Sequence, residues 1–161
     1  MTLETDDSQD VIYDKADWHI DGDFPDGLPE YQAGVHIGMY LAWIILHELF
    51  SPTLRERCGA DIEAVMGREK TGTQALMDDC VGILESAMLS ERGCLFTDYY
   101  YGHDPEESRY REDYSDTFID HPTVYHVDDT WANFDQIEDV INDAYAYWSQ
   151  ELAPAAMRVA P

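Results

Sequence analysis

The hydrophobic pattern is densest between Pro29 and Phe50, in the run PEYQAGVHIGMYLAWIILHELF. After Val35 only four residues interrupt the apolar side chains, namely His36, Gly38, His47 and Glu48. A helix that is apolar on nearly every side is covered by neighbours in several directions. Pro29 suits the first turn of a helix, where its missing N–H costs nothing. The pattern therefore predicts a buried central helix at about 29–50 that supplies most of the core.

The clearest amphipathic pattern lies near the end of the chain. Large apolar residues repeat at helical spacing from Trp131 to Leu152, opposite a mostly acidic face. This spacing predicts a helix that packs on the central one, with Asp129 or Thr130 as its cap. Pro154 marks its limit.

The middle of the chain predicts several shorter helices. Thr71 and Gln74 have capping-box spacing and precede an amphipathic helix expected at about 73–89. Two brief helices are expected at about 54–58 and 60–66, because Gly59 and Gly67 punctuate the segment. Ser90 is expected to cap a further helix, and another is expected around 110–118.

Two segments depart from helical periodicity. Residues 11–28 mix large apolar side chains with Asp, Gly and Pro, which predicts an ordered but irregular lead-in that covers the central helix. We expect Gly38 to permit the close approach of this lead-in. Residues 124–127 are β-prone and predict at most a short extended segment.

These patterns predict one mainly α domain, a helical bundle around the central helix. No internal repeat or Ser/Gly linker divides the chain. We expect a mobile acidic tail at 1–10, a single helical domain at 11–152 and a C-terminal tail at 153–161.

The charge balance narrows the possible partners. The chain carries 34 acidic and 9 basic residues, for a net charge of −25. Such a chain repels nucleic acid and anionic membranes, and it suits a basic partner, metal cations or simple solubility. Direct nucleic-acid or membrane binding is therefore not expected. The 45% apolar content is too high for a disordered acidic segment.

The cysteines and the N-terminal sequence indicate the cellular compartment in which the protein is expected. Cys58, Cys80 and Cys94 show neither metal-site spacing nor the even count of a disulfide framework, so we expect free thiols. The acidic start lacks the pattern of a signal peptide, and the longest apolar run is too short to cross a bilayer. We expect a cytoplasmic protein of undetermined oligomeric state.

The most specific motifs are WHxxGDFPxxLP at 18–29 and HIGMYLAW at 36–43. Together with matching positions in 89–100 and 125–134, they resemble a family of small bacterial proteins of unknown function. The resemblance covers about residues 13–150, although 54–75 match no fixed pattern. Members of that family are similar to the small acidic immunity proteins encoded beside polymorphic toxins and secretion systems. The resemblance implies a bacterial immunity protein without enzymatic activity.

Histidines are the first candidates for chemistry. His36 and His47 share one face of the central helix but lie about 16 Å apart at ~1.5 Å per residue, which is too far for one metal ion. Each could join carboxylates from other segments, as could His19. Because no Glu-x-x-His or H-E-x-x-H pattern is present, buried structural histidines are favoured, and no metal or cofactor is predicted.

Other chemical motifs are weak. Asp21-Gly22-Asp23 resembles the start of a calcium loop, but Phe24-Pro25 breaks its register, so a turn capped by aspartates is favoured. No G-x-S-x-G or phosphate-binding glycine loop is present.

The acidic and aromatic stretch from Phe96 to Tyr114 is the best candidate for partner binding, since tyrosines supply contact area and carboxylates steer a cationic partner. Its helically spaced tyrosines are expected in the core, while the connector that follows Tyr100 is expected at the surface. The predicted partner-binding residues are Asp21, Asp23, Tyr101, Asp104, Glu106, Glu107, Glu112 and Asp113.

The leading hypothesis is therefore an immunity protein that covers the basic active-site cleft of a cognate toxin or effector domain. One alternative is a metal-binding protein or hydrolase-like enzyme that uses His19, His36 or His47 with nearby carboxylates. A second alternative is an acidic regulator that mimics nucleic acid.

Overall fold

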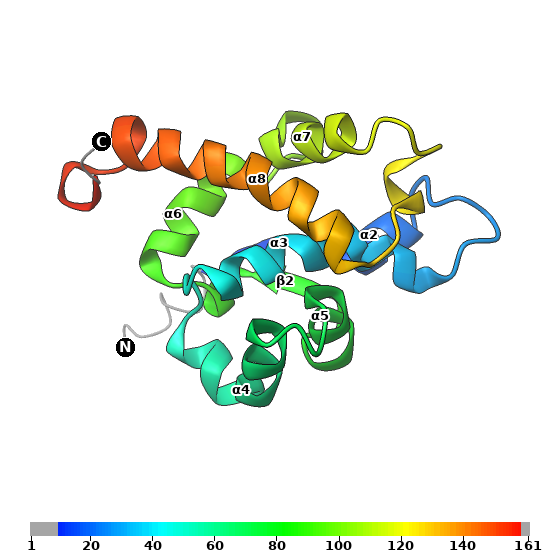
Figure 1. The fold of residues 1–161 in the computed structure, drawn as a ribbon, viewed down its shortest axis with the longest axis horizontal. Coiled ribbons are helices and arrows are strands. Elements are labelled where there is room, and N and C mark those ends of the chain that lie inside the picture. The colour runs from blue at the N-terminus through cyan, green and yellow to red at the C-terminus, as the bar shows by residue number, and fades with distance from the viewer. Residues whose placement is uncertain (1–9, 159–161) are drawn as a thin grey trace.

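The apolar run at the centre of the sequence forms the helix α3, Val35–Leu46, at the centre of the fold (Figure 1). The computed structural model describes residues 10–158. Every residue of α3 from Val35 to Ile45 is buried. Helices lie around it on several sides, and the only sheet in the described range has two short strands. The predicted mainly α bundle around a buried central helix is confirmed.

The central helix is shorter than the predicted 29–50. Glu30–Gly34 form a 3-10 turn, η1, and α3 begins at Val35. At the other end, Glu48 adopts a positive φ of 56°. The amides of Glu48 and Leu49 donate to the carbonyls of Ile45 and Ile44, which is the Schellman pattern of a helix end. Phe50 then forms an isolated bridge with Leu89.

One side of α3 is covered by α4 (Pro52–Met66) and α5 (Gly72–Asp79). Ser51 caps α4, which is kinked at Cys58 where two separate helices were predicted. The predicted capping box of Thr71 and Gln74 is present at the start of α5. A Cβ atom at Gly38 or Gly72 would overlap the facing helix. The close approach predicted at Gly38 therefore exists, but its partner is α5 instead of the lead-in.

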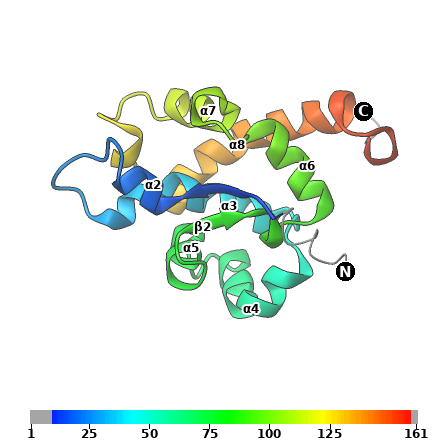
Figure 2. The ribbon, with the colours of Figure 1, turned by 180° about the vertical axis from the view of Figure 1, so that it is seen from behind.

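The predicted helix at 73–89 is wrong beyond Asp79. After a turn with positive φ at Val81 and Gly82, the chain forms β2, Ile83–Glu85. This strand pairs antiparallel with β1, Ile12–Lys15, in the segment expected to be irregular (Figure 2). The helix α2, Ala16–Ile20, follows β1 directly. The apolar spacing of 83–88 suits a helix, but the long-range pairing with β1 prevails.

The other side of α3 is covered by α8, Trp131–Tyr147, which in turn contacts α7, Arg109–Thr117. Thr130 caps α8, so of the two caps predicted, Asp129 and Thr130, the second is present. The helix α6, Glu91–Tyr100, starts at the predicted cap, Ser90. Four aromatic side chains of α6 and α7 lie in the core, namely Phe96, Tyr100, Tyr110 and Tyr114.

Short turns complete the fold. Residues 124–127 do not form the short extended segment considered from the sequence. Val124–His126 form a 3-10 turn, η4, which Thr123 caps. Other such turns are η2 (Ser86–Met88), η3 (Pro105–Glu107) and η6 (Ala155–Met157), while Trp148–Leu152 form a π-helical turn, η5.

The chain ends expected as tails are partly described. Residues 1–9 and 159–161 lie outside the described range. The Asp10 carboxylate accepts hydrogen bonds from the Ser86 hydroxyl and the Ala87 amide. Ala153 is buried, and the Met157 carbonyl accepts a hydrogen bond from Arg92 of α6. Residues 153–158 therefore pack against the domain.

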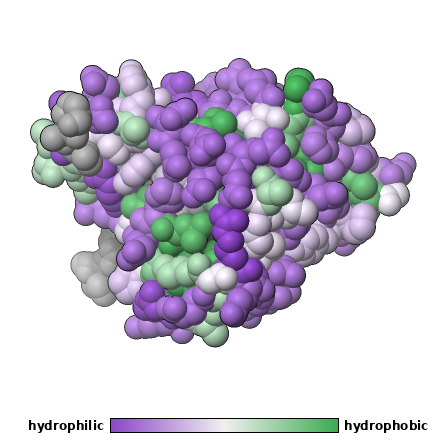
Figure 3. Space-filling view, in the orientation of Figure 1, coloured by the Kyte–Doolittle hydropathy of each residue, from purple (hydrophilic) through white to green (hydrophobic). Residues whose placement is uncertain are grey.

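The three cysteines are free thiols, as predicted. Within residues 10–158, no helix has the length and apolar character needed to cross a bilayer. Figure 3 shows one face of the molecule, on which hydrophilic residues predominate and apolar ones gather only in small patches.

Candidate functional site

The acidic connector, defined here as residues 104–107 between α6 and α7, is exposed at all four residues. Asp104 accepts a hydrogen bond from the Glu106 amide, which holds the turn η3. One hollow of about 560 Å³ has Glu106, Glu107 and Glu112 in its lining. A second hollow of about 360 Å³ has Asp104 and Glu107 in its lining. The structure thus brings four predicted residues to the linings of two hollows that share Glu107.

Two arginines also line these hollows. The Arg109 guanidinium lies 4.7 Å from the centre of the Tyr99 ring, so it is engaged in a cation–π contact. Arg111 is half-buried and also lines a third cleft, next to Asp14. The carboxylates in the two linings, those of Asp98, Asp104, Glu106, Glu107 and Glu112, outnumber these two arginines, so negative charge predominates.

Tyr101 does not belong to this surface, although the sequence places it among the binding residues. Its side chain is only 2% exposed, and its hydroxyl donates to Asp14 Oδ2 at 2.5 Å. The ring stacks on Tyr110. The helix α6 reaches Tyr100 and its last turn directs the next side chain inward, which helical spacing alone does not reveal.

The remaining predicted residues are divided. Asp113 is half-buried and accepts a hydrogen bond from the Tyr100 hydroxyl at 2.5 Å, so part of its role is structural. Asp21 and Asp23 are exposed in the turn after α2. In the described part of the chain, no hydrogen bond or ion pair joins these two aspartates to the acidic connector.

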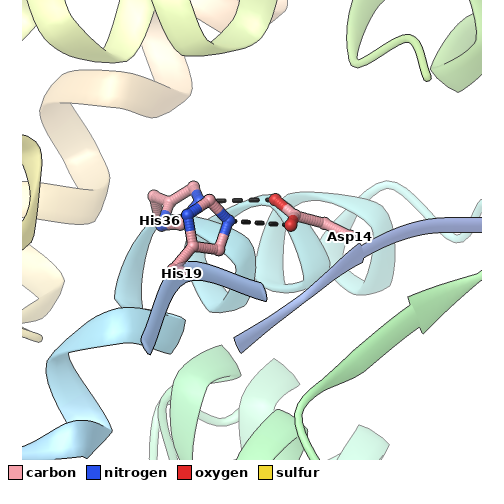
Figure 4. A group of neighbouring side chains, drawn as sticks. All are labelled: Asp14, His19 and His36. Atoms are coloured by element: carbon pink, nitrogen blue, oxygen red, sulfur yellow. Dashed lines mark hydrogen bonds and ion pairs between the residues drawn. The ribbon is translucent and has the colours of Figure 1, made fainter. Parts of the chain in front are cut away.

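A second group of polar side chains lies inside the fold, where β1, α2 and α3 meet (Figure 4). This buried cluster consists of Asp14, His19 and His36, which are at most 7% exposed. His19 Nε2 lies 2.8 Å from Asp14 Oδ1, and His36 Nε2 lies 3.3 Å from Asp14 Oδ2. One donor atom from each side chain lies within 4.8 Å of the other two.

Hydrogen bonds from outside the buried cluster hold two of its members. His19 Nδ1 lies 2.6 Å from the Tyr125 hydroxyl. Asp14 Oδ1 accepts from the Lys15 amide at 2.9 Å, in addition to the Tyr101 hydroxyl on Oδ2. Burial alone would raise the pKa of Asp14, but its contacts with His19 and His36 outweigh that effect and lower the pKa below its usual value. Asp14 is therefore a buried carboxylate anion.

His36 differs from the other two members. Among the described residues, neither of its ring nitrogens has a hydrogen-bond partner, although Nε2 is close to Asp14. Burial lowers the pKa of His36 below 6.5, against the opposing effect of Asp14. The ring is therefore a neutral imidazole at neutral pH, with a free lone pair.

His47 is separate from the buried cluster. Its Nε2 lies 3.6 Å from a carboxylate oxygen of Glu138, and its ring stacks on Trp43. Of the three histidines considered from the sequence, the structure brings together His19 and His36 only.

A comparison with protein families bears on both sites. The profile of one family, described as a domain of unknown function (DUF7832), matches residues 12–127. The chain belongs to the DUF7832 family. The match includes the buried cluster, Tyr125 and the acidic connector, and α8 follows it. No curated protein and no solved structure matches the chain significantly. The membership of a family of unknown function, expected from the sequence, is thus confirmed.

Sequence reasoning missed Asp14 as a member of the buried cluster in this DUF7832 domain. Asp14 and His19 lie on different elements, so no strand or helix period links them. The available signal was an aspartate between Tyr13 and Lys15 in a segment rich in aromatic residues, but such aspartates are common at turns.

Proposed function

We propose that this DUF7832 protein binds and neutralises a cognate toxin or effector domain by placing its acidic connector in a basic active-site cleft. The observation that carries the proposal is the exposure of Asp104, Glu106 and Glu107 in one turn, which lines two hollows. An exposed acidic turn suits a basic surface whose own substrate is anionic.

Electrostatics supports this kind of partner. The net charge of −25 favours rapid association with a basic surface. This attraction weakens as the salt concentration rises, because salt screens the charges. Complementary charges act mainly on the association rate and on the choice of partner. Packing supplies the rest of the binding energy, and the two hollows next to the acidic connector can receive partner side chains.

Binding to the product of the neighbouring gene tests the proposal. The wild-type protein is expected to copurify with that product and to inhibit its activity in a stoichiometric complex. Affinity should fall as salt increases. Absence of binding at micromolar concentration to any neighbouring toxin candidate would contradict the proposal.

Two charge-reversal variants locate the interface. Glu106→Lys with Glu107→Lys changes the net charge by four units within the acidic connector. The control, Asp139→Lys with Asp143→Lys, makes the same change at exposed positions of α8. We expect the connector variant to bind at least about tenfold more weakly than the control, because close like charges then meet at the interface. Equal affinities of the two variants would rule out the acidic connector as the contact surface.

A further inference from the structure

We propose that Asp14, His19 and His36 bind one divalent first-row transition-metal ion, of which Zn²⁺ is the best match. The site differs from the acidic connector, and the proposal does not depend on the proposed function. The donor set is two imidazoles and one carboxylate on three elements that meet inside the fold (Figure 4).

The distances suit a small ion. In a tetrahedral zinc site with metal–ligand distances of about 2.0–2.1 Å, neighbouring donor atoms lie about 3.3 Å apart. His36 Nε2 lies 3.3 Å from Asp14 Oδ2 and His19 Nε2 lies 2.8 Å from Asp14 Oδ1, so each imidazole faces a different oxygen of the carboxylate. One donor atom of each side chain lies within 4.8 Å of the other two, so rotations of the side chains would bring all three donors to one ion.

The surroundings of the donors resemble those of metal ligands. A metal-bound histidine usually donates its second N–H to an oxygen, which fixes the ring. Tyr125 is in position to accept from His19 Nδ1 at 2.6 Å. The Tyr101 hydroxyl and the Lys15 amide hold the carboxylate of Asp14 in the same way.

His36 supplies the independent observation. A buried polar atom without a hydrogen bond typically costs about 1–3 kcal/mol, so such atoms are rare and require an explanation. Both ring nitrogens of His36 are in this state among the described residues, while the ring is directed towards Asp14. A metal ion would use the lone pair of one nitrogen and the buried negative charge of Asp14 together.

The position of the buried cluster assigns the ion a structural role. The ion would join β1 and α2 to the central helix, which secures the lead-in to the core. Asp14 also lines a cleft of about 30 Å³, together with Tyr101 and Arg111. Because the charge of Arg111 opposes a cation on that side, the carboxylate must carry the electrostatic attraction.

Metal titration of the full-length protein tests this site. The protein is first treated with a chelator and then titrated with Co²⁺ or Zn²⁺ in excess Mg²⁺, which occupies surface carboxylates. We expect about one equivalent of Co²⁺ to bind, with the visible absorption of nitrogen-ligated cobalt, and Zn²⁺ to displace it. Binding no greater than the magnesium-competed background would overturn the proposal.

Variants and spectroscopy identify the ligands. Asp14→Asn and His36→Gln are expected to lower the zinc affinity at least about tenfold, whereas His47→Gln, outside the buried cluster, should bind as the wild type does. Unchanged affinity in the first two variants would overturn the proposal. If they fail to fold, the imidazole NMR spectrum of the wild type decides. Zinc should shift the signals of His19 and His36 and leave those of His47 in place, and any other pattern would contradict the assignment.

Discussion

Among single residues, Gly38 and Gly72 set the distance between α3 and α5. At either position an added Cβ atom would overlap the backbone or side chain of the opposite helix, namely Thr73 for Gly38 and Ala42 for Gly72. The sequence predicts a close approach at Gly38, because glycine in an apolar helix commonly allows one. The identity of the approaching element could not be predicted, because it depends on the tertiary packing of 72–79.

Replacement of Gly38 by alanine should separate these two helices. We expect Gly38→Ala to lower the free energy of unfolding by about 2–3 kcal/mol, since the overlap involves backbone atoms of Thr73 that cannot move aside. Chemical denaturation measures the change. Gly59→Ala is the matched control, because a Cβ atom there meets nothing within 4 Å. The control should be neutral or more stable by up to about 1 kcal/mol. Equal stability of the two variants would contradict this packing.

At the scale of secondary-structure elements, the side chain of Asp129 connects η1, the start of α5 and the start of α8, which lie far apart in the sequence. Its Oδ2 accepts hydrogen bonds from the Tyr31 hydroxyl of η1 and from the Thr71 hydroxyl before α5, each at 2.6 Å. The sequence offers Asp129 as a helix cap, but Thr130 performs that task. Local patterns predict caps well because a cap and its helix are adjacent, whereas the contacts of Asp129 depend on the fold.

Removal of this carboxylate should therefore lower the free energy of unfolding more than a surface substitution does. We expect Asp129→Ala to lower the free energy of unfolding by about 1–3 kcal/mol, since two hydroxyl donors lose their acceptor. The neighbouring Asp128→Ala, at an exposed position, should change it by less than about 0.5 kcal/mol. Denaturation midpoints of the two variants give the comparison, and a smaller loss for Asp129→Ala than for Asp128→Ala would refute the bridging role.

The sheet shows the same limit of sequence reasoning. Residues 83–85 have apolar neighbours at helical spacing, yet they form a strand because β1 lies beside them. The central helix, by contrast, could be predicted because its apolar character requires burial in any fold. The buried cluster could not, since its three members come from elements whose meeting is a tertiary event.

Across the whole molecule, buried tyrosine hydroxyls make the fold sensitive to alkali. Burial is the largest cause of raised pKa values in seven of them, namely Tyr13, Tyr40, Tyr100, Tyr101, Tyr110, Tyr114 and Tyr125. In the unfolded chain each ionises near pH 10. Because the folded-state pKa is higher, the contribution to stability is complete below pH 10 and is lost as the pH rises above it.

The stability of the protein should therefore fall steeply above pH 10. Between the unfolded-state pKa and the folded-state pKa of each such tyrosine, the free energy of unfolding falls by about 1.4 kcal/mol per pH unit. Because several tyrosines contribute together, the protein should unfold cooperatively. Circular dichroism and the absorbance of tyrosinate, recorded together during an alkaline titration, follow both events. Coincident transitions are expected. Ionisation of most tyrosines near pH 10 with the helices intact would show that these hydroxyls are not buried in solution.

The distribution of charge and packing assigns different roles to the interior and the surface. The central helix and the buried cluster lie inside the fold, while the acidic connector is exposed at its surface. This separation is the basis for placing partner binding outside α3. Exposure of Asp104, Glu106 and Glu107 agrees with the sequence prediction, because acidic residues in a Pro-containing connector rarely pack in a core.

Hydrogen–deuterium exchange of the protein, with and without the toxin domain proposed as its partner, tests this placement most directly. The largest protection on binding is expected in residues 104–112, with little change in α3, whose amides are protected already. Protection concentrated in α4 or α8, with none in residues 104–112, would contradict the assignment of partner binding to the acidic connector.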